Sequence, residues 1–313
     1  MNLSEQSGSK DGVLLDFLTD EERGIRIAIA RKGAEMIAFS RRQSDGSWRG
    51  FLYRDGDIRA PKRGWANHAT VMGYYIHRLW NERTHYRGHE IRGGTHGFIR
   101  DHLFDAPIRD KAGPGSLTYR LPTAEISQED YPLQVGMELT YQLIDNGVRV
   151  EFAFFNDETE LPAHVSFGLH PGFAVTDMET CRILLPPGTY RRLFAPGNFL
   201  NGKEEKISFS GGEMPFPKSE LPGSFLLDLS GVPERRFVLE DPGMGRRVEL
   251  DFSEVPYLTI WSDLNPFICL EPCWGLPDSN PQVPFEEKAG IQIIPPLGTL
   301  KRGFSLYGSF LHA

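Results

Sequence analysis

The sequence lacks the features that would place the protein in a membrane or outside the cell. No apolar run in its 313 residues reaches the length of a membrane span, and residues 1–12 are polar, without the charged and then apolar pattern of a signal peptide. Cysteine is scarce, with Cys181, Cys269 and Cys273 alone, which argues against a disulfide framework and favours a reducing compartment. We therefore expect a cytoplasmic protein with no membrane partner.

Basic residues are also in deficit, with 34 Lys and Arg against 42 Asp and Glu. The formal net charge of −8 argues against nucleic acid as a partner, because binding a phosphate backbone requires a basic surface. The oligomeric state is left open by the sequence. A small-molecule partner is the remaining expectation.

Helical spacing of apolar residues is scarce, and alternation at period two takes its place. Apolar residues alternate over 133–143 and again over 148–154. Between the two runs, Asn146-Gly147 supplies the two positive-φ residues that a type I′ turn requires. The pattern predicts one long antiparallel hairpin.

Shorter strand-like runs occur along the whole chain, separated by 33 Gly and 23 Pro at a spacing typical of β-sandwiches. The predicted strands cover residues 25–30, 35–40, 181–185, 236–239, 247–252, 257–261, 291–294 and 304–307. No linker, repeat or low-complexity tract divides the chain. We expect an all-β fold, a large antiparallel β-sandwich in a single domain over residues 13–313, with residues 1–12 disordered.

Three separate segments carry the ionisable residues of greatest interest: Thr95–Arg100, Phe167–Pro171 and Phe267–Pro272. Read as strands, each presents an ionisable side chain on the face opposite an apolar one, because side chains alternate at period two. The ionisable residues are His96, His170 and Glu271. Two histidines and a carboxylate are the groups of metal-free proton shuttling, although each taken alone could equally be a hydrogen-bonded structural residue.

Metal and cofactor motifs are incomplete. Cys269 and Cys273 flank Glu271, but no second Cys or His pair at zinc spacing accompanies them. His85 and His89, with His77 before them, lack the glutamate placement of a helical zinc motif, so we expect these three histidines to face solvent. The sequence therefore predicts no metal and no cofactor.

Further matches surround the three segments and give the chain a recognisable order of motifs. They are His96-Gly97-Phe98-Ile99-Arg100, Phe167-Gly168-Leu169-His170-Pro171, Trp261-Ser262, Pro266-Phe267, Cys269-Leu270-Glu271-Pro272-Cys273-Trp274-Gly275 and Lys288-Ala289-Gly290-Ile291. This order resembles the aldose 1-epimerase (mutarotase) family over residues 70–310, most closely its LacX-like branch. Four positions depart from the family pattern: Ile99 stands for alanine, Leu169 for glycine, Cys273 is inserted before Trp274, and His77-Arg78 replaces the usual Gly-Arg.

The resemblance implies a galactose mutarotase-like β-supersandwich with an open sugar cleft. It assigns Glu271 as the base and His170 as the acid that open and close the sugar ring. It also implies that His96 and Arg78 contact substrate, with Arg100 as a weaker candidate. Asp263 or Asp228 is a possible match for a hydroxyl-binding aspartate, and Trp261 or Trp274 could offer an apolar face to a pyranose ring or belong to the core.

Two alternatives stay open at this point. Five arginines crowd the region before and across the first histidine motif, and arginine binds phosphate bidentately, which would suit a hexose 6-phosphate or an acidic sugar. They are Arg78, Arg83, Arg87, Arg92 and Arg100. Alternatively, they are the outward face of an edge strand. The other alternative is a non-catalytic carbohydrate sensor, which would have no need of a matched acid and base.

Overall fold

The computed structural model describes residues 3–62 and 64–311, in which strands dominate and paired strands run antiparallel. Within these residues the helices are short 3-10 turns: η1 (Trp80–Glu82), η2 (Ile99–Asp101), η3 (Thr123–Glu125), η4 (Pro196–Asn198), η5 (Lys218–Gly223), η6 (Pro242–Met244) and η7 (Phe285–Glu287). None of the helices in the described part of the chain is long and apolar enough to cross a membrane. The predicted all-β, antiparallel fold class is confirmed.

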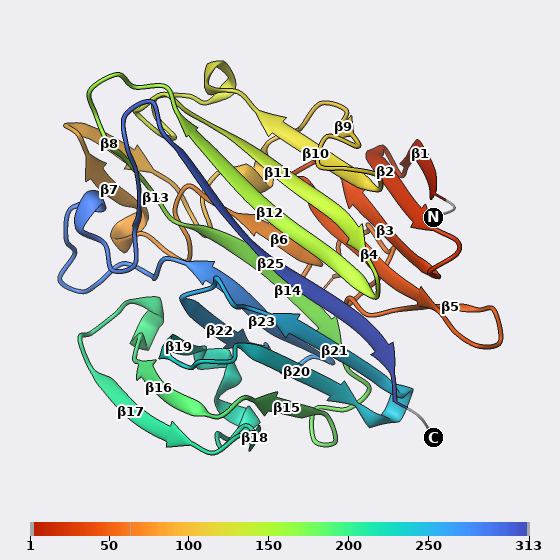
Figure 1. Ribbon diagram of the computed structural model, residues 1–313. Coiled ribbons are helices and arrows are strands. Elements are labelled where there is room, and N and C mark those ends of the chain that lie inside the picture. Colours follow the sequence, from red (N-terminus) through yellow and green to blue (C-terminus); the bar gives the residue numbers. More distant parts are fainter. Residues whose placement is uncertain (1–2, 63, 312–313) are drawn as a thin grey trace.

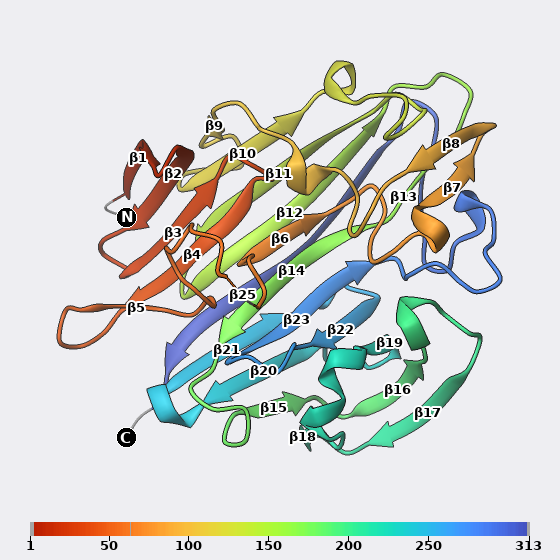
Figure 2. The same ribbon diagram turned by 180° about the vertical axis from the view of Figure 1, so that it is seen from behind.

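Two large sheets form the body of the sandwich (Figure 1). The first has nine strands in the spatial order β18 (Gly212–Glu213), β15 (Arg182–Leu185), β20 (Arg236–Asp241), β21 (Arg246–Asp251), β25 (Thr299–Phe310), β12 (Gly147–Asn156), β11 (Val135–Ile144), β10 (Ser116–Leu121) and β9 (Ile108–Arg109). The second has seven: β17 (Glu204–Phe209), β16 (Gly188–Leu193), β19 (Phe225–Gly231), β22 (Tyr257–Trp261), β23 (Phe267–Trp274), β14 (Phe167–Ala174) and β6 (Ala69–Met72). Figure 1 views the molecule from the side of the nine-stranded sheet, and Figure 2 from the side of the seven-stranded sheet.

Smaller sheets extend the sandwich. A five-stranded sheet contains β1 (Leu3–Lys10), β2 (Val13–Asp20), β3 (Ile25–Ala30), β4 (Glu35–Arg42) and β5 (Trp48–Gly50). Two pairs complete the strands: β7 (Arg83–Tyr86) with β8 (His89–Arg92), and β13 (Ala163–Val165) with β24 (Gln292–Ile294). The eight short strands predicted match these bounds within two residues at each end, except that β25 begins five residues before and ends three residues after its predicted bounds.

The main hydrophobic core lies between the two large sheets. Phe167 of β14 packs against Phe152 of β12, with ring centroids 5.1 Å apart. On β23, Ile268 and Leu270 are fully buried in the same core. Because side chains alternate along a strand, the residues between these project from the opposite face of the seven-stranded sheet. That second face carries His170 and Glu271.

The long hairpin of β11 and β12 is confirmed, but its predicted turn type is wrong. Ile144 pairs with Gly147, so the two-residue loop is Asp145-Asn146, and neither residue has a positive φ. Gly147 lies inside the strand, where a Cβ would come within 2.0 Å of the Leu306 carbonyl oxygen on β25. The glycine therefore permits close approach of a neighbouring strand instead of making the turn.

The N-terminus also differs from the prediction. Residues 3–10, expected to be disordered, form β1 and pair with β2 along the whole strand, while residues 1–2 lie outside the described residues. The connecting loop is Asp11-Gly12, with φ of +50° and +80°, the combination that a type I′ turn requires. Polar side chains on β1 have partners: Ser7 Oγ donates to Asp16 at 2.6 Å. The polarity of this segment is therefore that of an exposed edge strand, and the prediction of disorder for residues 3–10 is wrong.

The first histidine segment is not a strand. His96 and Gly97 have φ of +68° and +73°, and Ile99–Asp101 is the 3-10 helix η2. His96 is therefore presented by a loop, whereas the other two ionisable residues lie on strands as predicted.

Candidate active site

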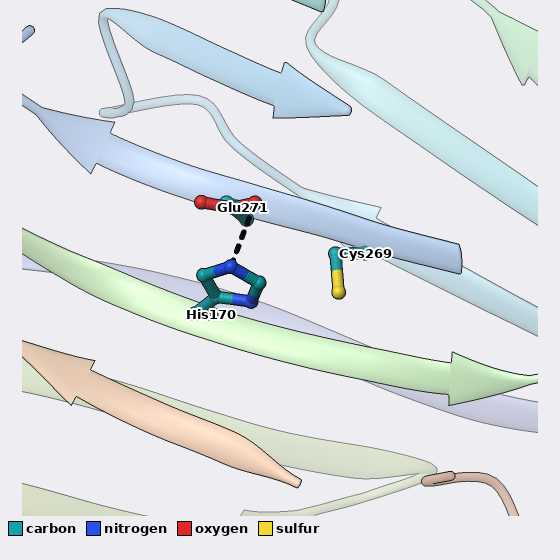
Figure 3. Close-up of side chains that lie close together, drawn as sticks. All are labelled: His170, Cys269 and Glu271. Carbon is teal, nitrogen blue, oxygen red and sulfur yellow. Dashed lines mark ion pairs between the residues drawn. The ribbon is translucent and has the colours of Figure 1, made fainter. Parts of the chain in front are cut away.

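Strand register brings His170 and Glu271 together. On β14 and β23, Gly168 pairs with Cys273 and Gly172 with Cys269, a register that puts His170 opposite Glu271. Directly opposed residues of an antiparallel pair have Cβ atoms roughly 5 Å apart, so long side chains there meet. His170 Nε2 lies 3.2 Å from Glu271 Oε1 (Figure 3).

The pair lies in the wall of a cavity of about 330 Å³ on the outer face of the seven-stranded sheet. Strands β14, β19, β22 and β23 supply His170, Leu226, Thr259, Trp261 and Glu271, and loops and short 3-10 helices supply the rest. The residues from loops and 3-10 helices include Trp65, Asn67, His77, Arg78, Thr95, His96, Arg100, Asn198 and Ser224. Four of the predicted site residues besides the pair therefore line the same cavity: His96, Arg78, Arg100 and Trp261.

Burial shifts both members of the pair toward their neutral forms. Glu271 is 1 % exposed, and burial raises the pKa of its carboxyl well above the ordinary value of 4.5. Burial lowers the pKa of His170 to about 3, and the charge of Arg100 adds to that shift. With both groups neutral, the pair holds one dissociable proton, and the two groups titrate as a coupled pair.

Two histidines from neighbouring loops hold each other in place. The His77 backbone N–H donates to His96 Nδ1 at 3.1 Å, and the His96 backbone N–H donates to the His77 carbonyl at 2.8 Å. Burial lowers the pKa of His96 well below its ordinary value, so this imidazole is neutral. Because Nδ1 accepts a hydrogen bond, neutral His96 carries its proton on Nε2 and is a hydrogen-bond donor there.

Aromatic rings form one wall of the cavity. Trp65 lies 5.0 Å from the His170 ring and 6.0 Å from Trp261, measured between centroids. Its approach requires a glycine on β14, since a Cβ at Gly172 would come within 2.3 Å of the Trp65 ring. Trp274, the other predicted stacking candidate, instead belongs to the core, where its ring stacks on Phe167 at 5.1 Å.

The five arginines divide into two groups. Arg78 and Arg100 line the cavity. Arg83, Arg87 and Arg92 are exposed in the hairpin of β7 and β8 and are not among the lining residues. Three of the five arginines therefore fit the alternative in which they face outward from an edge strand and do not bind a phosphate.

Neither aspartate candidate reaches the cavity wall. Asp263 lies in the turn after β22, where its Oδ1 accepts a hydrogen bond from the Asn265 backbone at 2.9 Å. Asp228 forms an ion pair with Arg191, whose Nε lies 3.1 Å from Asp228 Oδ2. Neither residue is among those that line the cavity.

Sequence reasoning missed several residues of the site. His77 was predicted to face solvent with His85 and His89; those two are exposed, but His77 lines the cavity and its Nε2 is buried without a protein partner. The position of His77 directly before Arg78, within the family motif, is the sequence feature that could have indicated its place in the site. Trp65 precedes the region of resemblance and carried no signal.

A buried ion pair lies beneath the loop that carries His77 and Arg78. The ammonium group of Lys288 contacts Asp278 Oδ1, and both side chains are 1 % exposed. Asp278 Oδ2 accepts hydrogen bonds from the Trp80 backbone at 2.8 Å and from Gln282 at 2.7 Å. Its own backbone N–H donates to the Arg78 carbonyl at 3.3 Å, which ties the Arg78 loop to residue 278.

Comparison with known proteins gives one consistent family. The family model described as aldose 1-epimerase matches residues 17–296. The plasmid-encoded protein LacX of Lactococcus lactis is 25% identical over 267 residues, which cover 77% of this chain and 85% of that protein. Among solved structures, a galactose mutarotase related enzyme from Lactobacillus acidophilus superposes with a TM-score of 0.81 at 21% identity, covering 98% of each chain. A galactose mutarotase-like protein from Lactobacillus casei gives 0.78 at 22% identity, covering 98% of this chain and all of that one.

Proposed function

Since the chain belongs to the aldose 1-epimerase family, we propose that it interconverts the α and β anomers of a free aldose by opening and closing the sugar ring. The observation that carries this proposal is the contact of 3.2 Å between His170 and Glu271 in the wall of a polar cavity. A screen of free aldoses by polarimetry or NMR exchange tests it directly. A protein that binds a sugar without accelerating anomerisation would instead be the carbohydrate sensor.

Ring opening requires one proton to leave the anomeric hydroxyl and one to reach the ring oxygen. We assign the first transfer to the Glu271 carboxylate and the second to the His170 imidazolium. Moving the shared proton from Glu271 to His170 produces this charged form, which hydrogen bonds from the sugar would favour. After rotation about the C1–C2 bond the roles reverse, so that each group regains its starting state with no net change in protons. Positioned acid–base groups each contribute about a hundred- to ten-thousandfold.

The remaining lining residues have assigned roles in binding. The Nε2–H of His96 and the guanidinium groups of Arg78 and Arg100 donate hydrogen bonds to sugar oxygens. Trp261 and Trp65 offer apolar faces to the ring carbons. A cavity of about 330 Å³ suits a monosaccharide, at the lower end of the range for small-molecule sites.

The pKa shifts predict a flat pH profile through the range in which a free histidine titrates. Activity requires the pair to hold one proton, and burial lowers the pKa of His170 to about 3, so a second proton adds only near that pH. We expect kcat/KM to stay constant from about pH 7 down to about pH 5. The measurement is the anomerisation rate against pH, with the spontaneous rate in the same buffers subtracted.

A loss of kcat/KM centred near pH 6.5 would contradict this prediction, because 6.5 is the ordinary pKa of an unburied histidine. Unfolding in acid is excluded as a cause by circular dichroism across the same range. A neutral sugar is the right substrate for this test, since it does not titrate there.

Free sugars should be preferred over their 6-phosphates. Three of the five arginines lie outside the cavity wall, and the two that line it are Arg78 and Arg100. Arg78 is itself exposed. These two guanidinium groups are enough to orient neutral hydroxyls but do not form a cluster for a phosphate. We expect glucose or galactose to react with a higher kcat/KM than the corresponding 6-phosphate, and raising salt to leave KM almost unchanged. Attraction between exposed charges, in contrast, is screened within about 10 Å at 0.1 M salt.

Arginine variants serve as the controls for substrate charge. If the phosphate were the true substrate, Arg100→Gln would weaken its binding and Arg92→Gln, on the exposed hairpin, would not. A clear preference for the phosphate, lost at high salt and in Arg100→Gln, would replace the free sugar with the phosphorylated one.

A further inference from the structure

Cys269 is a third neighbour of the pair, and the proposed reaction does not use it. Cys269 and Glu271 are two residues apart on β23 and so project from the same face of the sheet. One donor atom from each of His170, Cys269 and Glu271 lies within 4.8 Å of the others (Figure 3). We propose that these three residues form an inhibitory site for a thiophilic divalent cation such as Zn²⁺; the inhibition, unlike the binding, rests on the function proposed above.

The donor set selects the class of metal. An imidazole nitrogen, a thiolate and one carboxylate oxygen suit Zn²⁺, Co²⁺ or Cd²⁺, whereas Mg²⁺ and Ca²⁺ require mostly oxygen ligands. Zinc bonds to such donors are about 2.0–2.3 Å long, which places tetrahedral donors roughly 3.3–3.8 Å apart. His170 Nε2 and Glu271 Oε1 are already 3.2 Å apart, and the three donor atoms of the cluster lie within 4.8 Å of one another, so closing the site requires them to draw together by at most about 1.5 Å.

Charge favours occupation by a divalent ion. A thiolate and a carboxylate together balance the two positive charges of the metal, so the ion with its ligands has no net charge. This matters because all three residues are buried, and burying a net charge is costly. Coordination displaces the thiol proton into solvent. Because Arg78 and Arg100 line the same cavity, a cation that its ligands did not neutralise would be repelled.

Two residues of the cluster have polar atoms without a hydrogen-bond partner, and the cluster can be reached from the cavity. His170 Nδ1 and Glu271 Oε2 are buried and have no hydrogen-bond partner in the described residues. Both residues line the cavity, so a metal can arrive from it and take water as its fourth ligand. Three protein ligands with one open position form a labile site, and the bound metal occupies the lone pairs that proton transfer needs.

The first measurement reads binding without turnover. Protein stripped with a chelator is titrated with Co²⁺, and we expect one equivalent to produce the absorption of tetrahedral cobalt together with a thiolate-to-cobalt charge-transfer band. Cys269→Ala should lose the charge-transfer band, while Cys181→Ala, which removes a buried cysteine that is not part of the cluster, should keep it. A wild-type spectrum without thiolate ligation overturns the site, whether or not the protein is an anomerase.

The second measurement reads inhibition. Metal-free protein should be fully active; Zn²⁺ should inhibit it, chelator should reverse the inhibition, and Mg²⁺ should have no effect. In Cys269→Ala the inhibition constant for Zn²⁺ should rise at least about tenfold, with uninhibited turnover unchanged. Equal inhibition of Cys269→Ala and wild type would overturn the proposal. If Cys269→Ala fails to fold, Cys269→Val replaces it, and the wild-type cobalt spectrum remains decisive.

Discussion

Replacing Glu271 by glutamine should lower kcat for anomerisation by about a hundred- to ten-thousandfold, the range that a positioned base contributes. Glutamine keeps the shape of the side chain and cannot accept the hydroxyl proton. The side chain is buried, and no other carboxylate is among the described residues that line the cavity, so none can replace it. The measurement is anomeric exchange by NMR, with the spontaneous rate subtracted.

Stability separates this effect from misfolding. Burial raises the pKa of Glu271, which means that its ionised form is costly in the folded protein, so a neutral amide there should not lower the unfolding temperature. Glu205→Gln, the same substitution at an exposed position of β17, is the matched control and should keep full activity. Near-wild-type exchange in Glu271→Gln would remove this residue from the mechanism.

His170→Asn should have an effect of similar size. Because acid and base act on one proton pair, the double variant should lose little more activity than either single variant. Losses that simply multiplied would mean that the two residues act independently, against the shared-proton arrangement that the 3.2 Å contact supports.

The strands of the site could be predicted because their patterns are local. Alternation over residues 257–261 and 267–272 assigns faces correctly: Ile268 and Leu270 enter the core while Glu271 projects from the other side. What alternation does not contain is the register between β14 and β23, which places His170 opposite Glu271. Register depends on contacts between segments a hundred residues apart, so the family resemblance supplied what the pattern did not.

Loops and turns were harder because several local signals compete there. Asn146-Gly147 satisfies the type I′ pattern, yet Arg41 and the Gly308 backbone bind Asn146, and Gly147 is required by the approach of β25. Asp11-Gly12 carries the same signal within a polar segment, and there both residues do adopt a positive φ. His77 and Trp65 reach the cavity through loop paths that no periodicity describes.

Breaking the buried pair of Lys288 and Asp278 should produce the largest loss of stability outside the apolar core. Lys288→Met should lower the free energy of unfolding by about 3–5 kcal/mol, the cost of leaving one buried charge without its partner. Burial lowers the pKa of Lys288 to about 7, while the contact with Asp278 acts in the opposite direction by favouring the ammonium. Denaturant unfolding is therefore measured at about pH 6, where the lysine is charged.

A double-mutant cycle isolates the pair from the hydrogen bonds around it. Asp278→Asn removes the negative charge, and its amide oxygen can still accept from the Trp80 backbone, so its cost reports mainly the uncompensated ammonium. The double variant with Lys288→Met should cost clearly less than the sum of the single variants, by about 0.5–3 kcal/mol. Additive costs would mean that the two side chains do not interact energetically.

The same pair should also affect substrate binding, because Asp278 ties down the backbone at Arg78. Either single variant should raise KM for the sugar more than it lowers kcat. An equal loss in kcat and kcat/KM would place the pair in the chemical step instead.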